Sequence, residues 1–224
     1  VVTVEAGDSL TAIASRSDVA IADLEAENAI AATDTIHPGE VFDICVGNDI
    51  DDVTGASRLA PPLEAVTRQQ VELNELFAGT SMLPLVVDGD SGGYTRQAAC
   101  AARMGLGLPV HSGHVPAGSD EEAAIFAATE LSIPAGAPTD ATKWILIDQT
   151  CQVIFIGEGN ERVVDVFPTS TGEPGFQTHN IRAFAFRFDP ASDNDGWHDS
   201  ASFPVEVDNP VNGNMYKPLY FNNG

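Results

Sequence analysis

The hydrophobic period of the chain changes twice within its first 46 residues, and this restricts the fold more than any other feature. Residues 1–4 form a short β-type run, and apolar residues then recur at helical spacing over 10–14 and again over 21–28. Residues 40–44 alternate between polar and apolar side chains, as a half-buried strand does. The predicted order is strand, helix, helix, strand.

Residues at the expected helix ends support this order. The Gly7-Asp8-Ser9 turn supplies an N-cap, because a short side-chain oxygen can accept a free backbone N–H. The second helix, with Ile21 and Leu24 on one face, is expected to stop near Asn28, a residue that tolerates the left-handed conformation. His37-Pro38-Gly39 is a predicted turn.

Three motifs in this segment closely resemble a LysM module. They are Val-x-Ala-Gly-Asp-Ser-Leu-x-x-Ile-Ala at 4–14, Val-x-Ile-x-x-Leu-x-x-x-Asn at 19–28 and Ile-x-Pro-Gly-x-x-x-x-Ile at 36–44. The resemblance covers residues 1–46 and implies binding to glycans rich in N-acetylglucosamine, such as peptidoglycan or chitin.

In that family the sugar lies in a shallow groove between the first strand–helix loop and the second helix–strand loop. The resemblance therefore implies a glycan site made of Gly7, Asp8, Ser9, Leu10, Ala29, Ile30, Ile36 and His37. The alternative is that Gly7, Asp8 and Ser9 only form the turn and the cap. Phe42 is the only aromatic residue of the segment, so weak affinity is expected.

Residues 47–62 are predicted to be a linker, and residues 63–108 a second unit. Thr95 is expected to cap a final helix. The unit resembles the small three-helix peptidoglycan-binding domain, on the basis of Asp-Gly-x-x-Gly-x-x-Thr at 88–95 and Gly-Leu-Gly-Leu at 105–108. The alternative is that this loop only stabilises the unit. The first helix is predicted from Val66, Gln70, Val71, Leu73, Asn74, Leu76 and Phe77, and the final helix from Ala98, Ala99, Ala102 and Met104.

Residues 109–142 are predicted to be a second linker with one short acidic helix over 120–131. Ser119 is its expected N-cap and Glu122 occupies the capping-box position. His111-Ser112-Gly113-His114 could suggest a metal site, but loop histidines beside glycine are usually ordinary polar residues. No metal and no cofactor is assigned.

Residues 143–224 change to a strand period. Runs at 144–148, 151–156 and 162–168, separated by short turns, predict an antiparallel sheet. Ile-Leu-Ile-Asp-x-x-x-Gln-Val-Ile-Phe-Ile at 145–156, the strand at 166–172 and the run at 213–221 resemble the first two thirds of an L,D-transpeptidase catalytic domain. The predicted fold is thus multidomain α+β: a βααβ module, a small three-helix bundle and an incomplete, mainly antiparallel β domain.

The L,D-transpeptidase family uses a cysteine nucleophile in a Ser-His-Gly-Cys-type motif that a further histidine precedes. The sequence ends at Gly224, where the resemblance would place that histidine next, so we expect a domain truncated before its catalytic motif and assign no catalytic residue. Gln177-Thr178-His179-Asn180 also departs from the family's usual Thr-Pro-x-Gly. The acidic loop at 193–199 could ligate calcium, but its spacing does not fit the twelve-residue helix–loop–helix pattern, and we favour an ordinary acidic surface loop.

Charge and cysteine content restrict the partners. Lys+Arg is 10 against 33 Asp+Glu, a formal net charge of −23, which disfavours nucleic acid and anionic membrane surfaces. No apolar run approaches the roughly 20 residues of a membrane helix. Spacing leaves the pairing of Cys45, Cys100 and Cys151 open, and we favour Cys100–Cys151 because it would tie the second unit to the third.

Three functions remain open at this point. The first is a secreted cell-wall protein that binds peptidoglycan, as the N-terminal portion of an L,D-transpeptidase that cross-links stem peptides. The second is a non-catalytic peptidoglycan-binding protein with a degenerate β domain. The third is a wall lytic enzyme without its catalytic unit. The start at Val1, without methionine, fits a mature secreted form or an excised piece.

Overall fold

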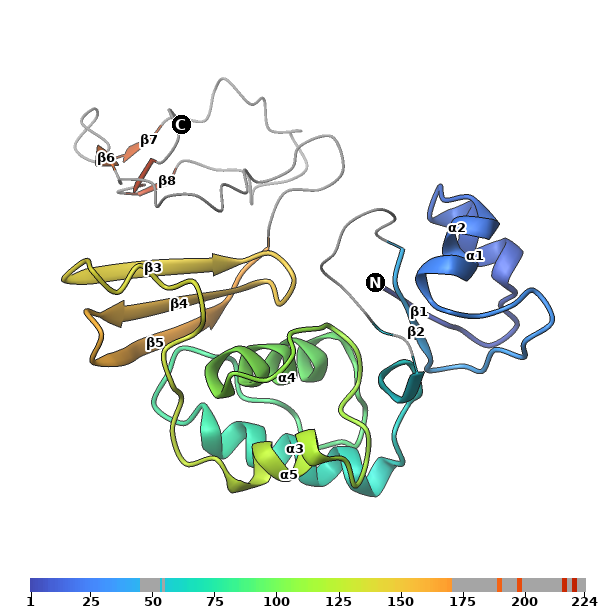
Figure 1. Ribbon diagram of the computed structural model, residues 1–224, viewed down its shortest axis with the longest axis horizontal. Coiled ribbons are helices and arrows are strands. Elements are labelled where there is room, and N and C mark those ends of the chain that lie inside the picture. Colours follow the sequence, from blue (N-terminus) through green and yellow to red (C-terminus); the bar gives the residue numbers. More distant parts are fainter. Residues whose placement is uncertain are drawn as a thin grey trace. The chain divides into compact units, whose positions relative to one another are not determined.

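The computed structural model describes residues 1–44, 53 and 55–170, together with the backbone of four two-residue strands between 189 and 220. The chain divides into two compact units, Val1–Thr178 and His179–Gly224. The fold mixes helices with antiparallel sheets (Figure 1). Within residues 1–44 and 55–170, no helix combines the length and apolar character that a membrane-spanning segment requires.

The first element group is a βααβ module. Strand β1 (Val2–Thr3) pairs antiparallel with β2 (Val41–Phe42), and helices α1 (Leu10–Arg16) and α2 (Ile21–Glu27) lie between them in sequence. The predicted order of strand, helix, helix and strand is confirmed. The module has its own core of buried apolar side chains: Val4, Leu10, Ile13, Ala14, Leu24, Ile30 and Phe42.

The predicted end of α2 near Asn28 is confirmed, whereas two finer expectations for this module are wrong. Asn28 does follow α2, but its φ is −97°, and the left-handed residue is Ala29 at +48°. The amide of Asn28 is instead buried, and it both donates to the carbonyl oxygen of Asp43 and accepts from the Asp43 N–H, each at 2.7 Å. Residues 40–43 are therefore buried without alternation, because polar partners cover the face that was expected to be solvated.

Three further helices follow the 3₁₀ turn Gly55–Arg58. They are α3 (Leu63–Leu76), α4 (Gly93–Leu106) and α5 (Asp120–Ala127), and each packs against the other two (Figure 1). Of the residues that predicted α3, Val71 is exposed. The predicted face of α4 is buried, as expected.

Thr95 does not cap α4. The helix begins at Gly93 after the N-cap Gly92, so Thr95 lies inside its first turn, and its hydroxyl donates to the carbonyl oxygen of Asp90 at 3.0 Å. Helix α5 ends at Ala127 rather than at Leu131. Beyond the helix end, Leu131 packs on Gly105 of α4.

Strands β3 (Lys143–Asp148), β4 (Val153–Glu158) and β5 (Arg162–Pro168) form the predicted antiparallel sheet in that order. One face of this sheet shares a hydrophobic core with α3, α4 and α5. The indole of Trp144 lies directly on Gly157, where any side chain would collide with it. The sheet contributes Trp144, Val153, Phe155 and Val166 to this core.

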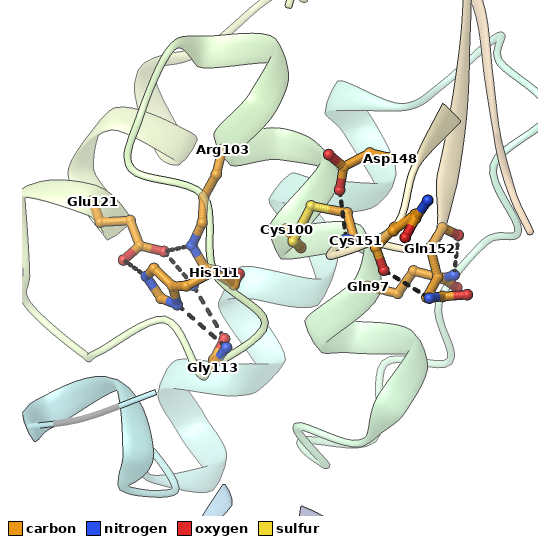
Figure 2. The surroundings of a disulfide bond; sticks show 10 residues. Gln97, Cys100, Arg103, His111, Gly113, Glu121, Asp148, Cys151 and Gln152 are labelled. Carbon is orange, nitrogen blue, oxygen red and sulfur yellow. Dashed lines mark hydrogen bonds and ion pairs between the residues drawn. A yellow bond between two sulfur atoms is a disulfide. The ribbon is translucent and has the colours of Figure 1, made fainter. Parts of the chain in front are cut away.

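The favoured disulfide is present. Cys100 of α4 is bonded to Cys151 in the turn before β4 (Figure 2). Beside it, the amide of Gln97 donates to the carbonyl oxygen of Gln152 at 2.6 Å. Helix α4 and the sheet are thus joined by a covalent bond, by polar contacts and by the shared core.

In the second unit, the structure describes two strand pairs only. Strand β6 (Asp189–Pro190) pairs with β9 (Leu219–Tyr220), and β7 (Trp197–His198) pairs with β8 (Met215–Tyr216), both antiparallel. The remainder of the acidic loop at 193–199, the Gln177–Asn180 segment and most of 213–221 lie outside the described residues.

Candidate glycan-binding site

The two loops of the implied glycan site belong to one module. Leu10 and Ile30 are buried in its core, and Ile36 packs against the same cluster. The loops also approach through the backbone, because the N–H of Val4 donates to the carbonyl oxygen of Glu40 at 2.8 Å and that of Gly39 donates to the oxygen of Val4 at 2.9 Å. The residues just before the first loop are therefore paired with the end of the second.

In the first loop, Asp8 and Ser9 have clear structural partners. The Asp8 carboxylate accepts from the Glu5 N–H and from the Arg16 guanidinium, both at 2.8 Å, and the hydrogen bond from Arg16 lowers the pKa of Asp8. Ser9 caps α1 by accepting from the Ala12 N–H at 3.2 Å, as predicted. These contacts favour the turn-and-cap interpretation of both side chains.

Gly7 is exposed with a φ of +92°, a left-handed conformation that favours glycine. It therefore offers a ligand only backbone groups. In the second loop, Ala29 is exposed immediately after α2, whereas Ile30 is buried. The surface available to a sugar at these positions is formed by backbone and small side chains.

His37 has a largely exposed side chain. About 69% of it is accessible, while its Nδ1 lies 3.1 Å from the buried carboxylate of Glu40. The second oxygen of that carboxylate accepts from Arg58 at 2.6 Å. Glu40 and Arg58 were not anticipated from the sequence, since a short-range motif holds no signal for a partner 18 residues away.

The loop at 88–95 is organised by one buried amide, that of Gln70 in α3. Its oxygen accepts from the N–H groups of Asp88 and Gly89, and its nitrogen donates to Asp88 Oδ1 at 2.9 Å and to Thr95 Oγ1 at 3.2 Å. The hydrogen bond from Gln70 lowers the pKa of Asp88. These contacts support the stabilising interpretation of Asp88 and Thr95.

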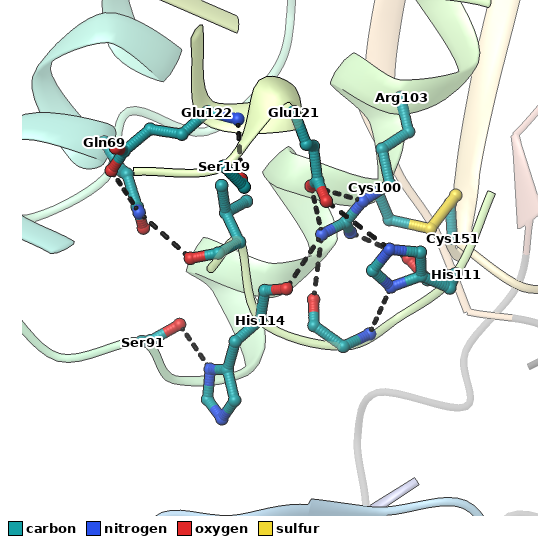
Figure 3. Close-up of polar contacts among 12 residues, drawn as sticks. Gln69, Ser91, Cys100, Arg103, His111, His114, Ser119, Glu121, Glu122 and Cys151 are labelled. Carbon is teal, nitrogen blue, oxygen red and sulfur yellow. Dashed lines mark hydrogen bonds and ion pairs between the residues drawn. A yellow bond between two sulfur atoms is a disulfide. The ribbon is translucent and has the colours of Figure 1, made fainter. Parts of the chain in front are cut away.

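The two loop histidines do not converge. His111 lies 3.6 Å from the carboxylate of Glu121, which also pairs with the fully buried guanidinium of Arg103 (Figure 3). The ring of His114 contacts Ser91 and Gly39 instead. Across the described parts of the chain, no group of three or more His, Cys, Asp and Glu residues is arranged to hold a metal ion.

The sequence profile of the LysM domain matches residues 2–44, the same stretch that forms the βααβ module. No curated protein and no solved structure matches the chain. LysM domains bind peptidoglycan or chitin-like glycans and typically occur in extracellular or cell-wall proteins. Residues 2–44 of this chain are a LysM domain.

Proposed function

We propose that this protein binds a glycan containing N-acetylglucosamine, peptidoglycan in particular, through the two loops of its LysM domain. The observation that supports this most is the LysM profile match over a segment with a complete βααβ fold. The exposed parts of the two loops, Gly7, Ala29 and His37, are proposed to contact the sugar. Asp8, Ser9, Leu10, Ile30 and Ile36 are proposed to shape the loops that present them.

Sedimentation with purified peptidoglycan and with chitin tests this proposal. We expect the wild-type chain to sediment and soluble N-acetylglucosamine oligomers to release it. His37→Ala should weaken binding about threefold to tenfold, the effect of one lost hydrogen bond. Ser15→Ala is the matched control, because Ser15 is an exposed residue of α1 outside both loops. If His37→Ala binds as tightly as the control, His37 does not contact the sugar.

We further propose that residues 63–108 are a peptidoglycan-binding unit and that residues 143–224 are the beginning of an L,D-transpeptidase-like domain in a secreted wall protein. The antiparallel β3–β4–β5 sheet is consistent with the opening strands of such a domain. Two wall-binding units beside a catalytic domain would raise the local concentration of stem peptides. No described residue is assigned a catalytic role.

The reading frame beyond the codon for Gly224 decides between this proposal and a non-catalytic wall-binding protein. A frame that continues into a histidine and then a Ser-His-Gly-Cys-like motif would support the transpeptidase proposal, and cysteine-dependent cross-linking is then the assay. A frame without both residues would overturn it. The glycan-binding proposal does not depend on that result.

A further inference from the structure

We infer that His114 and Arg58, which lie outside the LysM domain, are positioning residues for its second glycan-binding loop. This inference rests on the proposed glycan site. Both residues contact the segment that directly follows Ile36 and His37. Each does so through a buried polar contact, so that the loop depends on residues beyond the LysM motif.

The contact made by His114 fixes one of its ring protons. Its Nε2 lies 3.0 Å from the carbonyl oxygen of Gly39, which can only accept, so Nε2 must hold the proton. In the neutral ring, the Nδ1 atom accepts from the hydroxyl of Ser91, 2.8 Å away (Figure 3). Both ring nitrogens are paired, and only 2% of the residue is exposed.

The chain around His114 is held from the other side as well. Its N–H donates to the carbonyl oxygen of Ser57 at 2.8 Å, and its own carbonyl oxygen accepts from the buried guanidinium of Arg103 at 3.2 Å. A side chain at Gly113 would lie 2.8 Å from the Ser57 oxygen, so only glycine permits this close approach. The ring of His114 thus extends from a fixed backbone.

Arg58 holds the residue after Gly39. Its guanidinium donates to Glu40 at 2.6 Å and lies 5.3 Å from the centre of the Phe42 ring. Because Glu40 is only 3% exposed, its carboxylate needs this cation to offset the loss of water. The other oxygen of the same carboxylate contacts His37. Arg58 therefore fixes, through Glu40, the position of a proposed sugar-binding side chain.

Glycan affinity of the full chain tests the inference, with folding followed by calorimetry. His114→Leu removes the donor to Gly39 and should weaken binding of soluble N-acetylglucosamine oligomers about tenfold. His114→Gln keeps an amide donor and should recover part of that loss. If His114 only fills space, His114→Leu should bind at least as well as His114→Gln, because leucine fills the site with an apolar side chain of similar size.

The matched control is His111→Gln in the same segment, because His111 contacts Glu121 and Gly113 and leaves Gly39 untouched. It should bind within about twofold of the wild type. If His114→Leu does not fold, Ser91→Ala removes the hydroxyl that orients the ring and should weaken binding about threefold. If His114→Leu and Ser91→Ala both fold and both bind the oligomers as tightly as the wild type, the inference about His114 is wrong and the proposed function stands. If the wild-type chain has no glycan affinity, the proposed function itself is wrong.

Discussion

Ala29 has an unfavourable backbone conformation at the end of α2. Its φ of +48° places an alanine Cβ in the left-handed region, which costs about 1 kcal/mol or more relative to glycine. Ala29→Gly should therefore raise the free energy of unfolding of the LysM domain by about 0.5–1 kcal/mol, after the greater chain entropy of glycine is subtracted. Thermal unfolding of the two proteins measures this difference.

Asp18 provides the comparison for that substitution. Its φ is +54°, but aspartate tolerates this region better than alanine because its side chain can hydrogen-bond locally. Asp18→Gly should gain less stability than Ala29→Gly. The opposite order would show that backbone strain does not explain the two positions.

The stability of the protein should fall as acid protonates His114. Burial lowers the pKa of His114 from 6.5 to about 4, and nearby Arg96 and Arg103 add to the effect of burial. Between these values the unfolded chain binds the proton and the folded chain does not, so stability rises with pH from about 4 to 6.5. The loss on acidification through this range is at most about 3 kcal/mol.

His114→Gln, which does not titrate, isolates this contribution. Melting temperatures of both proteins between pH 4 and 7 should show a shallower slope for the variant. Parallel slopes would mean that His114 titrates normally in the folded protein. The comparison is needed because many carboxylates titrate in the same range.

At the scale of whole elements, the disulfide links α4 to the turn before β4. It closes a loop between cysteines 51 positions apart, and a disulfide of this kind typically contributes about 2–4 kcal/mol of stability. Replacing both cysteines, as Cys100→Ala with Cys151→Ala, should lower the free energy of unfolding by that amount. Chemical denaturation with and without a reducing agent provides the matching measurement on the wild-type chain.

Helices and strands were predictable here wherever the signal is local. The N-cap Ser9, the order of the LysM elements and the three strands after residue 142 follow from period and turn residues. Helix boundaries that depend on tertiary contacts were not predictable. The pattern at 120–131 continues past Ala127, but α5 ends there, and Leu131 beyond it packs on Gly105.

The same distinction applies to the candidate site. The eight residues of the two loops could be named from a motif of adjacent positions. Arg58 and His114 could not, because they reach Glu40 and Gly39 from 18 and 75 positions away. The alternation at 40–44 predicted a solvated Glu40, whereas the structure buries it, and a buried carboxylate requires a partner.

For the whole molecule, the formal net charge of −23 sets a limit on how it can bind the wall. Attraction to an anionic polymer is unfavourable at this charge, so affinity must come from neutral sugar contacts. Binding through the LysM loops is therefore expected to change little with salt. Affinity that rises steeply as salt is lowered would instead indicate a charge-driven mode.

Titration of the full chain with a soluble N-acetylglucosamine oligomer, followed by calorimetry at low and high salt, is the decisive test of glycan binding by the LysM domain. We expect saturable one-site binding with nearly equal affinity at the two salt concentrations, and weaker binding by His37→Ala than by Ser15→Ala. Absence of binding by the folded wild-type chain at millimolar oligomer would contradict it.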